Sequence, residues 1–337
     1  MQRERGLLEI FRSLPSPRRR ASKSEFSGIS VAPSSALYLA KDPEGRPSFL
    51  LPGHASLPPV RLENLEVRYR VRCRIIANKR SIDIESATLI GCLSTDEDLQ
   101  KYFVEVLGAV LQGFSAGSGA SRLGDLVEAL SELFQAASSE PASTAQGLWA
   151  ELMLIDGSTN PRVMINAWHS EVDDLFDFSA GAERIEVKSS SDKTRCHNFR
   201  YEQIERIPGL HALIASVLVD RSARGISLGD LWDRCREHVG ALPAQQLKVD
   251  SICFRSLGKH WRQWRDVSFD YHRATASLAF FNAESIPKPV APIPAGVSDV
   301  RFVSDLSLVK AIERMDVHAT ESLFAACAGL LSSSGGC

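Results

Sequence analysis

The sequence predicts a mixed α/β fold in which a β-rich N-terminal lobe precedes a domain with a mixed central sheet flanked by helices. Residues 65–76 alternate polar and apolar side chains, which is the pattern of a half-buried strand. Residues 122–137 instead repeat apolar side chains at helical spacing. Residues 211–219 are strongly apolar, as expected of a buried central strand that runs parallel to an earlier one.

Composition and charge are those of an ordinary globular protein. The 337 residues are 44% hydrophobic and 24% charged, and the chain is long enough for two domains. The formal net charge of −2 provides no global basic field, so a nucleic-acid site would need local basic patches. Seven cysteines without a C-x-x-C pair indicate neither a disulfide framework nor a zinc site. No apolar run reaches the roughly 18 residues of a membrane span, so we expect a cytoplasmic protein that does not bind membranes.

The chain is expected to divide into four segments. These are a flexible basic N-terminal arm (1–26), a β-rich lobe with a helical hairpin (27–137), a second domain with a C-terminal β extension (138–330) and a disordered tail (331–337). The arm contains Arg18, Arg19 and Arg20, which fit either a solvated arm or one that contacts phosphates. Pro141, within the polar segment 138–144, marks the boundary between the two domains.

Arginines line one face of the strand predicted at residues 65–76. The apolar face carries Val67, Tyr69, Val71 and Cys73, and the opposite face carries Arg68, Arg70, Arg72 and Arg74. Such a face can be solvated or paired with nearby glutamates. Alternatively, it belongs to a sheet that faces nucleic acid and binds its phosphates. Shorter strands are expected at 37–40, 48–51 and 81–87.

Helices are predicted where apolar residues recur every three or four positions. The expected helices are residues 96–113, 122–137, 145–156, 198–207, 228–239, 243–257 and 317–330. Thr95 with Asp98 is the expected cap of the first helix, and Ser227 with Asp230 caps the helix that starts at residue 228. Further strands are expected at 163–168, 267–271, 277–281 and 297–308. The Gly/Ser-rich break at 115–121 lacks the lysine of a phosphate-binding loop, which argues against a nucleotide site.

The chemistry-bearing stretch is residues 173–189, which predicts two short strands joined by a tight turn at Ala180-Gly181-Ala182. Glu186 and Lys188 are two residues apart on the second strand, so both project from the same face, and the turn can bring Asp177 opposite them. Two carboxylates can hold a hard divalent ion while the amine orients a water for phosphodiester hydrolysis. The alternative is an ordinary solvated face, because a chain of this length contains about one Glu-x-Lys by chance.

These residues resemble the signature of the PD-(D/E)xK nuclease superfamily, which shares the fold of many restriction endonucleases. Asp177, eight intervening residues and Glu186-Val187-Lys188 carry the resemblance, with Phe176 in the place of the proline. The chain is similar to a bacterial family called "PD-(D/E)XK motif protein", and the similarity continues through His197-Asn198-Phe199, Gln203 and Gly296-Val297-Ser298. The resemblance implies a restriction-endonuclease-like core within residues 138–330.

The resemblance also implies roles for individual residues. Mg²⁺, for which Mn²⁺ can substitute, would be bound by Asp177, Glu186 and the backbone carbonyl of Val187, and Lys188 would orient the attacking water. Glu151 matches an acidic residue that the preceding helix contributes to the metal shell, although a boundary glutamate of an amphipathic helix looks the same. Gln203 matches a glutamine that steadies the lysine and the water in recombination-type members.

Basic residues away from the motif are candidates for DNA contact. They are Arg68, Arg70, Arg72, Lys193, Arg195, Lys259, Arg262 and Arg265. The segment 259–265 mixes basic and aromatic residues, which suits stacking and phosphate contact in a DNA groove. Equally, its two tryptophans can bury a helix end.

The function expected from the resemblance is Mg²⁺-dependent endonucleolytic cleavage of double-stranded DNA in a bacterial restriction or anti-phage system. Since a double-strand break needs two active sites, a homodimer or a partner protein from a defence operon is expected. A second hypothesis is a catalytically silent nuclease fold that binds DNA or acts as a scaffold, although such proteins usually lose one of Asp177, Glu186 and Lys188. The third is an unrelated interaction module, in which Asp177 and Glu186 would lie far apart.

Overall fold

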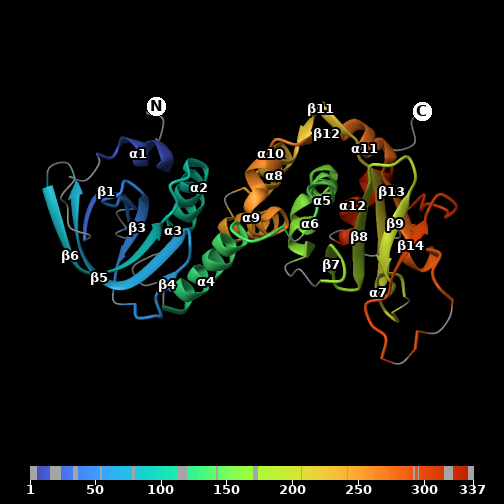
Figure 1. Ribbon diagram of the computed structural model, residues 1–337, viewed down its shortest axis with the longest axis horizontal. Helices are drawn as coiled ribbons and strands as arrows, with labels where there is room; N and C mark the ends of the chain where they lie inside the picture. Colours follow the sequence, from blue (N-terminus) through green and yellow to red (C-terminus); the bar gives the residue numbers. More distant parts are fainter. Residues whose placement is uncertain are drawn as a thin grey trace. The chain divides into compact units, whose positions relative to one another are not determined.

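The computed structural model comprises two compact units, residues 1–138 and 139–337, and mixes helices with strands in both (Figure 1). The structure describes all residues except 1–5, 16–23, 33–36, 54, 78–79, 113–119, 142, 170–173, 206, 241, 291–292, 295, 315–321 and 333–337. The predicted basic run at 18–20, most of the break at 115–121 and most of the predicted tail lie outside the described residues. The mixed α/β class expected from the sequence is confirmed.

The N-terminal unit is built on a six-stranded sheet with the order β1-β2-β3-β6-β5-β4. Its strands are β1 (Glu25–Ala32), β2 (Leu37–Lys41), β3 (Pro47–Pro52), β4 (Val60–Arg61), β5 (Leu65–Ala77) and β6 (Arg80–Cys92). Strand β1 also pairs in parallel with β5, through Phe26 and Ile75, so five of the strands close into a small barrel. Its interior is filled by buried side chains that include Phe26, Leu50, Ile75 and Leu89.

The long strand β5 owes its alternation to apolar side chains that enter this barrel. Val67, Cys73 and Ile75 are buried, as the period of two predicts. A bulge interrupts the register between Arg68 and Cys73, and Arg70 adopts a positive φ of 54° there. The arginine face is therefore not one continuous row.

Helices complete the N-terminal unit. They are α1 (Leu7–Ser13), α2 (Glu97–Tyr102), the π-helical turn η1 (Phe103–Leu107), α3 (Gly108–Gln112) and α4 (Ala120–Ala136). The helices predicted at 96–113 and 122–137 are thus confirmed. The first begins one residue later than expected, because the side chain of Asp96, not Thr95, accepts the backbone N–H of Leu99 at 2.9 Å.

The second unit holds a four-stranded mixed sheet with the order β13-β10-β8-β7. Its strands are β7 (Phe178–Ala180), β8 (Glu183–Ser190), β10 (His211–Leu218) and β13 (Ala279–Asn282). The predicted turn between β7 and β8 forms around Gly181, whose φ of 51° favours glycine. Strand β10 is buried and runs parallel to β8, as the apolar run at 211–219 predicted, whereas β7 and β13 run antiparallel to their neighbours. Strand β8 is therefore an interior strand.

The helices of this unit pack partly against the sheet and partly against one another (Figure 1). They are α5 (Ala145–Gly157), α6 (Pro161–Ala167), α7 (Tyr201–Ile204), α8 (Leu228–Val239), α9 (Pro243–Leu257), η2 (Gly258–His260), α10 (Trp261–Arg265), α11 (Tyr271–Ser277), η3 (Ala283–Ser285) and α12 (Leu323–Ser332). Every residue of α5 from Leu148 to Ile155 is buried, so this helix lies inside the unit. Helix α8 begins with the predicted capping box of Ser227 and Asp230. Helix α12 is attached to β8, because the Phe324 N–H donates to Glu183 Oε2 at 2.9 Å.

Several local predictions are wrong. The strand expected at 163–168 is helix α6, because Asn160 caps its N-terminus and Pro161 occupies its first turn. The helix expected at 198–207 is short: residues up to Arg200 belong to β9 (Cys196–Arg200), which pairs with β14 (Arg301–Asp305). The strand expected at 267–271 is reduced to β12 (Ser268–Phe269), which pairs with β11 (Arg221–Ser227), and α11 follows it.

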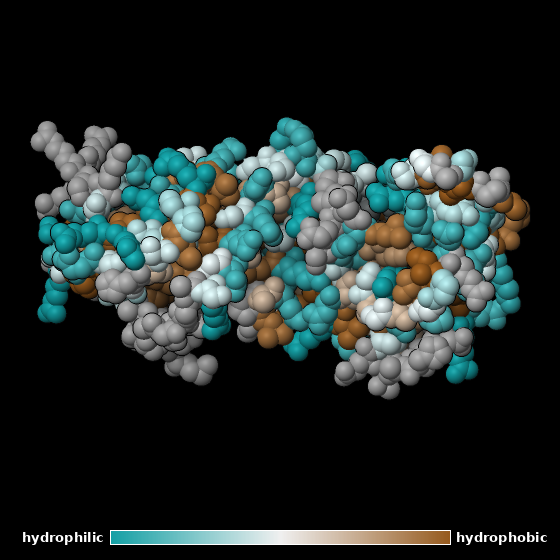
Figure 2. Space-filling view, turned by 90° about the horizontal axis from the view of Figure 1, so that it is seen from below, coloured by the Kyte–Doolittle hydropathy of each residue, from teal (hydrophilic) through white to brown (hydrophobic). Residues whose placement is uncertain are grey.

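The surface shown in Figure 2 carries hydrophobic side chains as separate patches among hydrophilic ones. Among the described residues, no helix combines the length and the apolar character needed to cross a membrane. The described part of helix α4 has 17 residues, fewer than the roughly 20 that a span requires.

Candidate active site

The centre of the candidate site is strand β8, where Glu186 and Lys188 lie side by side. Their spacing of two places both side chains on one face, and Lys188 Nζ is 2.6 Å from Glu186 Oε1. Glu186 is 6% exposed in this interior strand. A carboxylate so buried needs a cation or several donors nearby.

Asp177 occupies the bend immediately before β7 and reaches the same strand. Its Oδ2 accepts the backbone N–H of Val187 at 2.6 Å, which places this carboxylate next to the Glu186–Lys188 pair. The three residues of the sequence motif are therefore brought together. The contact of Val187 with the site is made through its N–H, while metal coordination by its carbonyl stays a prediction.

Glu151 approaches from the buried helix α5. Its Oε2 accepts a hydrogen bond from Trp168 Nε1 at 2.7 Å and lies 3.4 Å from His169 Nε2. The ligand atoms of Glu151, His169 and Asp177 all lie within 4.8 Å of one another. Glu151 thus reaches Asp177, as the resemblance implied, although its metal-binding role stays a prediction.

His169 is a site residue that sequence reasoning missed. An isolated antiparallel bridge joins Trp168 to Phe178, and the His169 N–H donates to the Asp177 carbonyl at 2.7 Å. This pairing places His169 opposite Asp177 across the bend. The only available signal was a histidine eight positions before the aspartate, and spacing alone does not show that two loops pair.

The electrostatics of the site favour a bound cation. Burial raises the pKa of Asp177 well above its usual range, and the nearby charges of Glu186 and Glu151 raise this pKa further. The Val187 N–H and the charge of Lys188 oppose the shift without cancelling it. Three carboxylates thus share a buried region with one lysine and one histidine, and oxygen-rich donors of this kind fit a divalent ion.

Gln203, in α7, contacts the loop that carries Asp177. Its Nε2 donates to the Leu175 carbonyl at 2.9 Å, and its Oε1 accepts the Arg200 N–H at 3.0 Å. The side chain is buried. These contacts fix the chain two residues before Asp177, so Gln203 supports the aspartate, whereas the expected contact was with the lysine.

A buried polar network lies on the Lys188 side of the site. His197 Nε2 is 2.8 Å from Ser216 Oγ, and Ser216 is the partner of Lys188 in the β8–β10 register. Burial, together with the nearby charges of Lys188 and Arg195, lowers the pKa of His197 to about 4. His197 is therefore neutral at pH 7. Lys188 also lies 5.5 Å from the centre of the Phe199 ring.

Arg195, expected to contact DNA, is half-buried and belongs to this network. It donates to the carbonyl and the hydroxyl of Ser216, both at 2.8 Å, and also to the Ser277 carbonyl. Lys193, in the same loop, is exposed. Of these two basic residues, only Lys193 therefore presents its side chain to solvent.

The basic-aromatic segment 259–265 packs against its own unit. Trp261 is buried, and the Arg262 guanidinium lies 4.6 Å from the centre of its ring. Arg265 pairs with Asp233 at 2.6 Å, while Lys259 pairs with Glu140. This geometry favours the alternative in which the tryptophans bury a helix end, and DNA contact by these cations stays untested.

The arginines of β5 are also partly paired with acids. Arg68 Nε is 3.3 Å from Glu66 Oε2, and Arg72 pairs with Glu85. Arg70 is exposed at the bulge. Pairing with glutamates on the same surface reduces the positive field that phosphates would meet.

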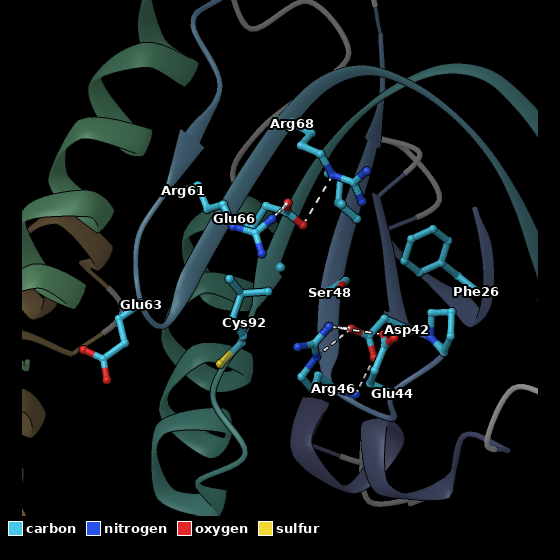
Figure 3. A pocket seen from close by; sticks show the side chains of 14 residues that line it. Phe26, Asp42, Glu44, Arg46, Ser48, Arg61, Glu63, Glu66, Arg68 and Cys92 are labelled. Atoms are coloured by element: carbon cyan, nitrogen blue, oxygen red, sulfur yellow. Dashed lines mark hydrogen bonds and ion pairs between the residues drawn. The ribbon is translucent and has the colours of Figure 1, made fainter. Parts of the chain in front are cut away.

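A polar cavity of about 520 Å³ lies within the N-terminal unit. Figure 3 shows Arg46 reaching Asp42 and Glu66 lying between Arg61 and Arg68. The Arg46–Asp42 and Arg61–Glu66 distances are 2.8 and 3.0 Å. The wall of the cavity thus carries charges of both signs, several of which pair with each other.

The sheet of the second unit, with the acids and the lysine gathered on β8, defines a nuclease-like α/β fold. Residues 7–307 match the model of the family described as "Putative PD-(D/E)XK family member, (DUF4420)", and the chain belongs to that family. The superfamily resemblance drawn from Asp177, Glu186 and Lys188 is confirmed by this match, which includes the N-terminal barrel. No curated protein and no solved structure gives a significant match.

Proposed function

We propose that this protein is a Mg²⁺-dependent endonuclease that hydrolyses phosphodiester bonds of double-stranded DNA. The observation that carries the proposal is the docking of Asp177 on the Val187 N–H, beside the Glu186–Lys188 pair. Membership of the PD-(D/E)XK family supports a nuclease chemistry. The restriction or anti-phage role is proposed from the family resemblance alone.

Each residue of the motif has a distinct task. Asp177 and Glu186 offer carboxylate oxygens to Mg²⁺, or to Mn²⁺ in its place, and Glu151 adds negative charge next to them. Such an ion, when bound, activates the scissile phosphate as a Lewis acid and makes a bound water more acidic. Lys188, held 2.6 Å from Glu186, orients the attacking water and stabilises the negative charge that develops at phosphorus.

Two further parts of the proposal concern assembly. A double-strand break requires two active sites, so we propose that the protein acts as a homodimer or together with a partner protein. Exposed Lys193 lies in the loop that follows β8, and we propose it as a phosphate contact. Its replacement by glutamate should weaken DNA binding at low salt and reduce the salt dependence of binding.

The test is cleavage of plasmid and linear DNA with Mg²⁺ or Mn²⁺ by the wild type and the variants Glu186→Gln and Lys188→Met. Metal-dependent cutting by the wild type, absent in both variants, supports the proposal, provided that circular dichroism shows both variants to be folded. Asp192→Asn, in the exposed loop after β8, is the matched control and should cut normally. If the wild type does not cut modified or unmodified DNA but still binds the ion, the protein is a silent DNA-binding or scaffolding subunit instead.

A further inference from the structure

We propose that His169 is a nitrogen ligand of the ion held at Asp177 and Glu151, so that the site selects a first-row transition-metal ion over Mg²⁺. The inference rests on the proposed function, because it concerns the same ion. It departs from that proposal in ligand set and in metal preference. Its basis is the convergence of one imidazole and two carboxylates from three separate segments of the chain.

The distances suit a shared ion. Two ligands that are each about 2.1 Å from one ion cannot be more than about 4.2 Å apart. Glu151 Oε2 and His169 Nε2, at 3.4 Å, already meet this limit. Asp177 lies within 4.8 Å of both, so a small side-chain rotation completes the group.

Neighbouring hydrogen bonds hold the three side chains in place. Trp168 Nε1 donates to the same Glu151 oxygen that faces His169. The backbone of His169 is fixed to Asp177 by the 2.7 Å hydrogen bond across the bend. The Val187 N–H donates to Asp177 Oδ2 and fixes the orientation of this carboxylate. Partners of this kind orient metal ligands in known sites.

The chemistry of the donors determines the preference. Mg²⁺ binds oxygen almost exclusively and gives up its waters reluctantly. Imidazole binds first-row transition ions more strongly than it binds Mg²⁺, whereas the carboxylates of Glu151 and Asp177 accept both kinds of ion. Removal of His169 should therefore weaken the binding of the transition ion selectively.

The experiment measures metal binding by the full-length chain in the absence of DNA. Calorimetric titrations with MnCl₂ and MgCl₂ compare the wild type with His169→Ala and His169→Asp. We expect His169→Ala to lose at least about tenfold in Mn²⁺ affinity, the scale seen when metal-site partners are removed, with little change for Mg²⁺. His169→Asp, which supplies oxygen instead of nitrogen, should narrow the preference for Mn²⁺. The exposed residue His272 in α11 provides the control His272→Ala, which should bind as the wild type does.

A spectroscopic measurement reads the nitrogen directly. Pulsed electron paramagnetic resonance of bound Mn²⁺ should show nitrogen coupling in the wild type and in His272→Ala but not in His169→Ala. Equal losses of Mn²⁺ and Mg²⁺ affinity, or nitrogen coupling that persists without His169, would overturn the inference. If DNA cleavage requires Glu186 and Lys188 but His169→Ala has the same preference for Mn²⁺ over Mg²⁺ as the wild type, the inference fails and the proposed function stands. If bound Mn²⁺ shows nitrogen coupling that depends on His169 but the protein cleaves no DNA, the inference stands and the proposed function fails.

Discussion

Replacement of Asp177 by asparagine should stabilise the metal-free protein while it abolishes the proposed activity. Burial and the charges of Glu186 and Glu151 all disfavour the ionised form of Asp177. Asparagine removes the charge and keeps an oxygen that accepts the Val187 N–H. A site arranged for a cation is strained when the cation is absent, and the substitution relieves that strain.

The distance to Glu151 sets the size of the effect. Two unit charges 4.8 Å apart repel each other by about 3.5 kcal/mol at an effective dielectric constant near 20. The destabilisation of the folded protein by ionised Asp177 cannot exceed about 4.4 kcal/mol at pH 7, because the carboxyl can take up a proton instead. Protonation costs about 1.36 kcal/mol for each pH unit above the usual pKa of 3.8. The weaker hydrogen bond to asparagine costs about 1 kcal/mol. We therefore expect a net gain of about 1 to 3 kcal/mol.

The gain should depend on pH with a definite sign. The folded protein binds a proton at Asp177 more tightly than the unfolded chain does, so the wild type loses stability as the pH rises above 3.8 toward the raised folded pKa. Asp177→Asn has no carboxyl at this position, so this pH-dependent loss of stability is absent from the variant. The stability difference between the two proteins should vanish below pH 3.8 and grow above it.

Tryptophan fluorescence during urea unfolding, with a chelator present, measures this difference. All five tryptophans lie at positions 149 to 264, so the signal reports the second unit alone. Asp192→Asn removes an exposed acid and should change stability by less than about 0.5 kcal/mol. A destabilised Asp177→Asn, or a difference that does not change with pH, would refute the reasoning.

Three other substitutions test the surroundings of the motif. Lys188→Met should destabilise the unit by about 3 kcal/mol in the same urea assay, because Glu186 loses its partner, and adding Glu186→Gln should restore most of the loss. Gln203→Ala should lower the free energy of unfolding by about 1 to 3 kcal/mol, because the loop before Asp177 loses its hydrogen bonds. The same variant should bind Mn²⁺ more weakly in calorimetry, and an unchanged affinity would contradict the supporting role of Gln203. The contribution of buried His197 to stability should fall as the pH drops from 6.5 toward about 4, opposite in sign to that of Asp177, because the unfolded chain takes up a proton that His197 does not. His197→Gln should flatten this part of the stability profile.

Local signals made much of the fold predictable. Three confirmed predictions rest on residues that are close together in the sequence. They are the capping box at Ser227 and Asp230, the turn at Gly181 and the buried strand β10. The strand expected at 163–168 is wrong because so short a segment, apolar except for Asn166, fits either the helical or the strand period. Its N-terminal signals, Asn160 and Pro161, indicate a helix.

The candidate site was less accessible, because its contacts join distant segments. The spacing of Glu186 and Lys188 follows from strand geometry, whereas the docking of Asp177 on Val187 depends on how β7 pairs with β8. The position of His169 depends on a single bridge between loops. Arg195 looked solvent-facing in a polar loop, but its long side chain reaches a neighbouring strand at Ser216.

The attachment of α12 to β8 has a consequence for biosynthesis. Glu183, at the start of the strand that carries the motif, accepts the N–H of Phe324, 141 residues later in the chain. At about 5 to 20 residues per second, a ribosome needs about 7 to 28 s to add that stretch. The N-terminal barrel uses residues made well before it and can form during this delay. The hydrogen bond that attaches the start of β8 to α12 must wait until residue 324 has been made, so the newly made protein passes through an interval in which the strand that carries Glu186 and Lys188 lacks this anchor.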